Sequence, residues 1–239
     1  MPSIPFAPGV RPRRHCYSAA MATTSTFEPG AYWTPTRAAA AEQRMRDVLA
    51  SPEVQAMMAQ AAEGDDPAAA AAAMFDAAPG AATSGKVELE HCRFRRGEPR
   101  DLPRLVQLIA GAHLPPMFIE EFLPGFAIVE HDGEVVGCGG LELYDEGCGV
   151  IRSIVVDEPA KGIGLGRRIT ELLIDDARAF GATDLYLFTM DAWDFWRHMG
   201  FVDVPLGGWK MPPRVSWQYQ FMDGHPEFAG QIHSMWRRA

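Results

Sequence analysis

The residues with the clearest chemical potential form a glycine-rich turn between a strand-like run and a helix-like run. They read Lys161-Gly162-Ile163-Gly164-Leu165-Gly166-Arg167. Glycines permit a tight turn and let the backbone approach a ligand closely. The N–H groups at the start of a helix, together with the helix dipole, attract anions. With Lys161 and Arg167 adding positive charge, the segment predicts a pyrophosphate site.

The spacing of the glycines excludes two common nucleotide sites. The dinucleotide pattern G-x-G-x-x-G would need glycine at Arg167 or Ile169, and the P-loop pattern G-x-x-x-x-G-K-[ST] is absent. A turn that only packs a helix against a sheet is the alternative interpretation.

Hydrophobic periodicity predicts the elements that position this turn. Gly149–Val156 is expected to be the strand before it, and Ile163–Phe180 the amphipathic helix after it. Asp132-Gly133 predicts a type I′ hairpin between two further strands. The other expected strands are His91–Arg95, Asp184–Thr189 and Phe201–Val204. The other expected helices run from Glu98 to about Ala112, from Pro115-Pro116 through Phe122, over Ala192–Met199 and over Pro226–Arg238.

Composition narrows the class of protein. Lys and Arg total 22 against 31 Asp and Glu, a net charge of -9, which argues against a nucleic-acid partner. No apolar run approaches the ~20 residues of a membrane span. The four cysteines form no CxxC pair, and the seven histidines show no metal-ligand spacing. We therefore expect free thiols, no metal, no membrane partner and a cytoplasmic location.

The chain divides by composition near residue 85. Residues 1–85 are an Ala-rich, partly helical or disordered N-terminal extension, and residues 86–239 are expected to form the main domain. Residues 1–27 resemble a transit peptide or an over-long start before Met21. The 36–62 stretch predicts helices with thin apolar faces, which are expected to lean on the main domain or on a second subunit, as in a homodimer.

The glycine turn and the order of elements resemble the GCN5-related N-acetyltransferase (GNAT) superfamily. Its acetyl-CoA motif, [R/Q]-x-x-G-x-[G/A], matches the turn with Lys161 in the first position. The resemblance covers roughly residues 91–205, including the stretch from Ala192 to Phe201. It implies an α/β fold with a mixed central sheet flanked by helices, and acetyl-CoA between two splayed strands.

The same resemblance implies roles for residues near the turn. Backbone N–H groups around Ile154 and Val155 would face the oxyanion, and Val156 would pair with the pantetheine arm. Trp196 stands where the superfamily often has a tyrosine that protonates the CoA sulfur, and an indole cannot replace that acid. Trp196 is expected either to line the thioester pocket or to pack in the core.

A narrower resemblance, to arsenic-resistance N-acetyltransferases and to domains that act on glutamate, extends to about residue 236. It rests on Gly140-Leu141-Glu142, Ile151-Arg152-Ser153, Leu187-Phe188-Thr189 and the tail segments 212–215 and 225–229. Arg152, Ser153 and Thr189 would then face the acceptor, with Arg152 holding a carboxylate or arsonate. An ion pair of Arg152 with Glu142 or Asp145 is the alternative.

Glu142 is the candidate general base, acting through water on the acceptor amine. Its alternative is a solvent-facing strand residue in a salt bridge. These inferences predict an N-acetyltransferase that uses acetyl-CoA and a small amino-acid-like amine. The alternatives are a non-catalytic acyl-CoA-binding module and an enzyme that acetylates proteins or peptides.

Overall fold

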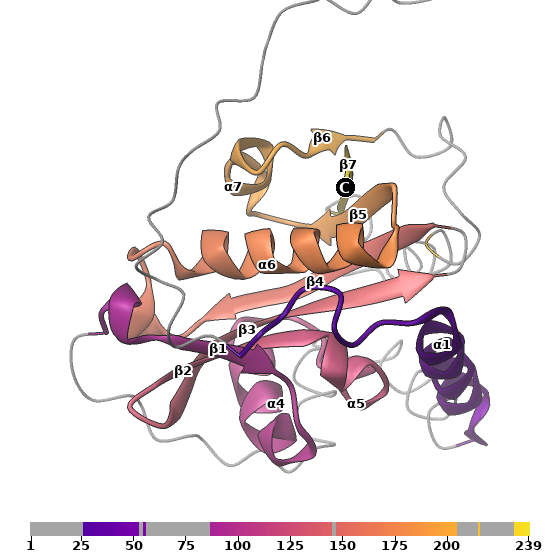
Figure 1. Ribbon diagram of the computed structural model, residues 1–239, viewed down its shortest axis with the longest axis horizontal. Coiled ribbons are helices and arrows are strands. Elements are labelled where there is room, and N and C mark those ends of the chain that lie inside the picture. The colour runs from indigo at the N-terminus through magenta and orange to yellow at the C-terminus, as the bar shows by residue number, and fades with distance from the viewer. Residues whose placement is uncertain (1–25, 53–54, 56–86, 145–146, 205–214, 216–231) are drawn as a thin grey trace, which may run out of the picture.

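A seven-stranded mixed sheet forms the centre of the molecule. The computed structural model describes residues 26–52, 55, 87–144, 147–204, 215 and 232–239. The strands lie in the order β1-β2-β3-β4-β5-β7-β6 (Figure 1). Their bounds are β1 Arg93–Arg96, β2 Phe126–His131, β3 Glu134–Tyr144, β4 Cys148–Val156, β5 Asp184–Thr189, β6 Val202–Asp203 and β7 His233–Arg238. The expected mixed α/β fold is confirmed.

Local turn chemistry sets the antiparallel half of the sheet. Asp132 and Gly133 have φ angles of 51° and 86° between β2 and β3, as a type I′ turn requires. β3 then pairs with β4, also antiparallel. β4 and β5 are parallel and are joined through the long helix α6, Leu165–Phe180. This crossover brings the glycine turn to the end of β4.

Helices cover both faces of the sheet. α6 lies on one face, and α4 (Leu102–Gly111) and α5 (Ile119–Phe122) lie on the other (Figure 1). A capping box between Glu98 and Asp101 starts the turn that leads into α4. α7 spans Trp193–His198. Short 3₁₀ turns occupy Leu89–His91, Pro99–Asp101, Leu123–Gly125 and Glu158–Ala160.

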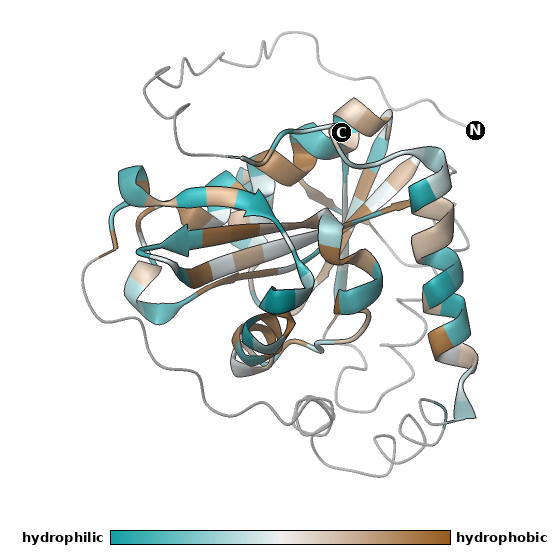
Figure 2. Ribbon diagram, turned by 60° about the horizontal axis from the view of Figure 1, so that its bottom comes forward, coloured by the Kyte–Doolittle hydropathy of each residue, from teal (hydrophilic) through white to brown (hydrophobic). Residues whose placement is uncertain are grey.

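Part of the N-terminal region packs against the sheet domain. α1, Pro35–Ala50, is capped by Thr34 and buries Met45. Phe27 and Trp33 belong to the same core cluster as the sheet. Figure 2 shows hydrophobic residues gathered along the strands and the inner sides of the helices. The expected leader and the helix beyond residue 52 fall largely outside the described residues, and the division at residue 85 stays a prediction.

The expected C-terminal helix over Pro226–Arg238 is wrong for its last six residues, which form β7. β7 pairs along the full length of β5, and Met235 is fully buried. The Trp236 indole donates to Asp184 at 2.9 Å. Without β7, β5 would expose its backbone groups as an open edge, so tertiary pairing outweighs local helix propensity. None of the described helices is long and apolar enough to cross a membrane.

Candidate active site

The two parallel strands of the sheet separate where the predicted site lies. β4 and β5 pair only from Cys148–Asp184 to Val150–Tyr186. β4 continues to Val156 and β5 to Thr189 without further pairing between them. The sheet therefore opens into a V whose β4 side carries the residues from Ile151 onward.

A β-bulge lies on the β4 side of this opening. Gly140 is opposite Arg152 and Cys138 is opposite Val155, so two β4 residues face Gly139 alone. One of them, Ser153, has a φ of 52°, in the left-handed region. A bulge leaves its extra residue outside the ladder and redirects the backbone. The amides expected to face an oxyanion, around Ile154 and Val155, are thus at an irregular point of the strand.

The glycine turn forms an open cradle at the start of α6. Gly162 and Gly164 have φ angles of 81° and 91°, a conformation that L side chains rarely adopt. A β-carbon placed at either residue meets nothing within 4 Å. Gly164 is the N-cap of α6, and no described side chain caps that end. The free helix end and the open space fit the diphosphate of coenzyme A.

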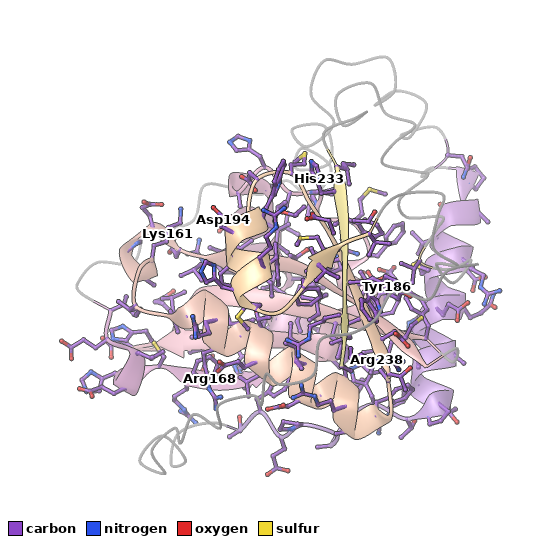
Figure 3. The ribbon with its side chains drawn as sticks, turned by 90° about the horizontal axis from the view of Figure 1, so that it is seen from above. Lys161, Arg168, Tyr186, Asp194, His233 and Arg238 are labelled. Carbon is purple, nitrogen blue, oxygen red and sulfur yellow. The ribbon has the colours of Figure 1, made fainter. Side chains whose placement is uncertain are left out.

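Basic side chains surround the cradle on the surface. Lys161 Nζ lies 2.5 Å from a carboxylate oxygen of Glu158, and Arg168 lies 3.8 Å from Glu171. Figure 3 shows Lys161 and Arg168 near this end of α6. Such exposed pairs are weak, so they do not prevent these cations from attracting a phosphate. Arg167 is exposed beside them.

An ion pair missing from the sequence-based prediction fixes the exit of β4. Arg104 of α4 donates to the Asp157 carboxylate at 2.6 Å and to the Val135 carbonyl at 3.2 Å. The N–H of Asp157 donates to Val136, and the other Asp157 oxygen accepts from the N–H of Glu158. The sequence signal that was available is Asp157 itself, a residue typical of a cap, before Glu-Pro.

Glu142 and Arg152 meet in the structure. Arg152 Nη1 donates to Glu142 Oε1 at 2.7 Å, and Tyr144 Oη donates to Glu142 Oε2 at 2.6 Å. Glu142 is fully buried. For Arg152 this is the ion-pair alternative. For Glu142 the salt bridge is present, but the expected solvent-facing position is wrong, because the side chain is buried in the sheet. Tyr144 had no expected role from the sequence. The roles of Glu142 as base and Arg152 as carboxylate clamp stay predictions.

Thr189 and Trp196 also have partners within the protein. Thr189 Oγ1 accepts the N–H of Ala192 at 3.2 Å, just before α7. Trp196 is 7% exposed and makes edge-on ring contacts with Phe195 and Phe201. Trp196 thus has the contacts of a core residue, as expected if it packs in the core instead of lining the thioester pocket. Contact of Trp196 with the coenzyme and of Thr189 with the acceptor stays a prediction.

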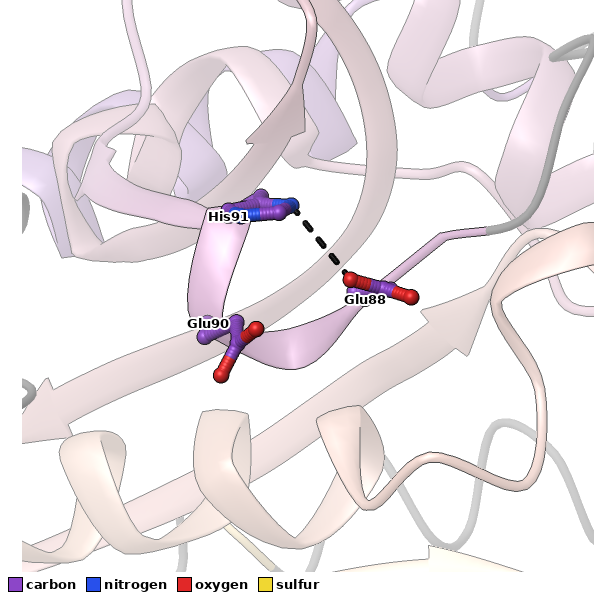
Figure 4. Close-up of side chains that lie close together, drawn as sticks. All are labelled: Glu88, Glu90 and His91. Atoms are coloured by element: carbon purple, nitrogen blue, oxygen red, sulfur yellow. Dashed lines mark ion pairs between the residues drawn. The ribbon is translucent and has the colours of Figure 1, made fainter.

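Two other features lie apart from the opening between β4 and β5. Glu88, Glu90 and His91 form a surface cluster on a 3₁₀ turn, in which His91 lies 3.7 Å from Glu88 (Figure 4). No further observation points to a metal there, and we assign none. A hollow of about 570 Å³ lies between α1 and α5, and it shares no residue with the glycine turn.

An open V beside an uncapped glycine turn is the arrangement that the sequence resemblance implies for a coenzyme A-dependent acetyltransferase. The model of the acetyltransferase (GNAT) family matches residues 86–201. An amino-acid acetyltransferase of Mycobacterium tuberculosis is 32% identical over 124 residues, covering 47% of this chain and 71% of that protein. The chain belongs to the GNAT acetyltransferase family.

Other relatives are longer proteins. An amino-acid acetyltransferase of Neisseria meningitidis serogroup A is 29% identical over 116 residues, which are 45% of this chain and 27% of that protein. An N-acetylglutamate synthase of Neisseria gonorrhoeae, solved with coenzyme A and N-acetyl-glutamate, matches with a TM-score of 0.54 and 25% identity. That match covers 62% of this chain and 35% of the synthase. The chain thus spans about a third or less of these two relatives.

Proposed function

We propose that this protein transfers the acetyl group of acetyl-CoA to the amine of a small, amino-acid-like acceptor. The observation that carries the proposal is the open glycine cradle at Gly162–Gly164, next to the separation of β4 from β5. Residues 161–167 would hold the diphosphate through backbone N–H groups and positive charge. Val156 would pair with the pantetheine arm as an added strand would.

The proposed reaction is a direct transfer. The neutral amine nitrogen of the acceptor attacks the thioester carbonyl carbon, and a carbon–nitrogen bond forms as the carbon–sulfur bond breaks. The amine loses one proton, and the CoA thiolate leaves and takes one up. Backbone amides near Ile154 and Val155 would stabilise the oxyanion. A thiol with a pKa of about 8.5 leaves acceptably near neutral pH, so Trp196 in place of an acid is tolerated.

Relatives support the class of acceptor. The proteins reported above are named for acetylation of amino acids or synthesis of N-acetylglutamate. We infer an acceptor with an α-amine and a carboxylate, in a site edged by Arg152, Ser153 and Thr189. An organoarsenical amino acid is the narrower alternative, and residues 86–239 are the proposed catalytic unit, working in the cytoplasm.

Two measurements test the proposal. Isothermal titration should show coenzyme A binding, and release of free thiol should follow when acetyl-CoA is mixed with a panel of amino acids. Coenzyme A binding without turnover on any amine would favour the non-catalytic module, which Trp196 motivates. Turnover with peptides but not with free amino acids would favour peptide acetylation.

A further inference from the structure

Three side chains connect the centre of the sheet to the loop between α4 and α5. Tyr144 and Glu142 lie on β3, and Arg152 lies on β4. Tyr144 donates to one Glu142 oxygen at 2.6 Å, and Arg152 donates to the other at 2.7 Å. Nη2 of Arg152 then donates to the Met117 carbonyl at 2.7 Å and lies 3.4 Å from the Pro115 carbonyl. One guanidinium therefore joins β3 to this loop.

The three connected side chains, Tyr144, Glu142 and Arg152, lie on the face of the sheet opposite α6. A β-carbon on Gly140 would lie 3.2 Å from Cγ of Arg152, whereas one on Gly139 would contact Ile169 and Leu173 of α6. Arg152 directly precedes the bulge residue Ser153 and follows the last parallel pair of β4 and β5 by two positions. The Pro115–Phe118 loop is thus held at the β4 side of the opening, away from α6.

Both carboxylate oxygens of Glu142 already have partners inside the protein. Glu142 is fully buried, and the Arg152 side chain is 17% exposed. Without this carboxylate, a largely buried guanidinium would lack a compensating charge, which is strongly unfavourable. Burial, reinforced by the charge of Glu142, also raises the pKa of Tyr144 well above its usual range. Tyr144 therefore remains a hydrogen-bond donor to Glu142.

The loop itself has a strained backbone on both sides of the carbonyls that Arg152 contacts. His113 and Phe118 have φ angles of 56° and 58°. A non-glycine residue in this region is unfavourable, and it persists only where its surroundings determine it. The hydrogen bonds from Arg152 supply such a constraint. Releasing Arg152 should therefore let the loop relax.

We propose that Glu142 is a positioning residue and not the general base. Acting through Arg152, it holds the Pro115–Phe118 loop as a wall of the acceptor half of the opening. Tyr144 orients Glu142 from behind. This inference rests on the proposed function, since it assigns the acceptor side of the same site. Contacts with the loop would then determine which amines fit the site, and Glu142 would not act as the base.

The test combines steady-state kinetics with hydrogen exchange of the loop. Glu142→Gln keeps the shape of the side chain and removes its charge. We expect acceptor KM to rise by about tenfold or more, kcat to change by less than about threefold, and acetyl-CoA KM to stay unchanged. Amide exchange in a peptide spanning residues 113–122 should accelerate. Glu130→Gln is the matched control, because Glu130 also pairs with an arginine, Arg95, at 2.7 Å but lies on β2.

A loss of kcat of about 100-fold with a flattened low-pH limb and unchanged loop exchange would overturn the proposal and restore Glu142 as base. Where Glu142→Gln does not fold, Tyr144→Phe, which removes one hydrogen bond, should show the same pattern at smaller size. Hydrogen exchange requires no turnover. Faster loop exchange in a protein that acetylates no amine would refute the proposed function and leave the loop anchor standing.

Discussion

Arg96 of β1 and Asp176 of α6 form a bidentate ion pair that also holds the N-terminal segment. Nη2 and Nη1 of Arg96 lie 2.7 Å and 3.0 Å from the two carboxylate oxygens, and Asp176 is fully buried. The N–H of Gly30 donates to the same carboxylate at 2.7 Å. Arg96 also donates to the Glu28 carbonyl and stacks over Phe27. Residues before the family match are thereby part of the folded unit.

Asp176→Asn should destabilise the protein strongly. The substitution leaves the Arg96 guanidinium without a compensating charge in a largely buried site, which costs about 3–5 kcal/mol of unfolding free energy. Urea denaturation would measure the loss. Asp175→Asn is the matched control on the same helix, since Asp175 makes an exposed pair with Arg178 and should cost less than about 0.5 kcal/mol. Equal losses of unfolding free energy at both positions would contradict the role of Asp176 in joining Arg96 to the N-terminal segment.

Gly164→Trp should abolish coenzyme A binding while the fold survives. The side chain would occupy the cradle, and the space around its β-carbon is open. Gly133→Trp controls for backbone strain, because Gly133 has a φ of 86° against 91° at Gly164 and is equally open. Titration calorimetry should show loss of binding in the first variant alone. Retained affinity in Gly164→Trp would remove the glycine turn as the diphosphate site.

Arg104→Gln should weaken use of acetyl-CoA selectively. Arg104 fixes Asp157 at the exit of β4, before the 3₁₀ turn Glu158–Ala160 that leads into the glycine turn. Loosening this anchor should raise KM for acetyl-CoA by about three- to tenfold, with the acceptor KM unchanged. Arg100→Gln, at an exposed surface pair with Glu98, should leave both constants as they are. A rise in acceptor KM alone would show that the Arg104–Asp157 pair serves another part of the site.

Stability should fall as the pH rises above 9. Burial raises the pKa of the Cys138 thiol from 9.0 to about 12. Above pH 9 the unfolded chain loses this proton and the folded chain keeps it, so the free energy of unfolding drops by about 1.4 kcal/mol per pH unit. Cys138→Ala should reduce the slope of stability against pH by nearly that amount between pH 10 and 11, where the unfolded thiol is almost fully ionised. Identical slopes in urea titrations of both proteins would contradict it.

Short-range chemistry in the sequence predicted much of the fold. The Asp132-Gly133 hairpin, the amphipathic helix α6 and the helix start at Glu98 each depend on residues within a few positions of one another. The glycine turn was predictable for the same reason, because its glycines and the helix start that makes it an anion site are adjacent in the chain. Family resemblance added the expected opening between β4 and β5.

Tertiary structure decided what depends on distant partners. β7 is a strand because β5 needs a neighbour, although the segment alone favours a helix. The sequence left two roles open for Arg152, and the structure pairs it with Glu142 and with loop carbonyls 35 and 37 residues away. Local propensities act over one or two turns of chain, whereas burial and charge compensation depend on which residues the completed fold brings together.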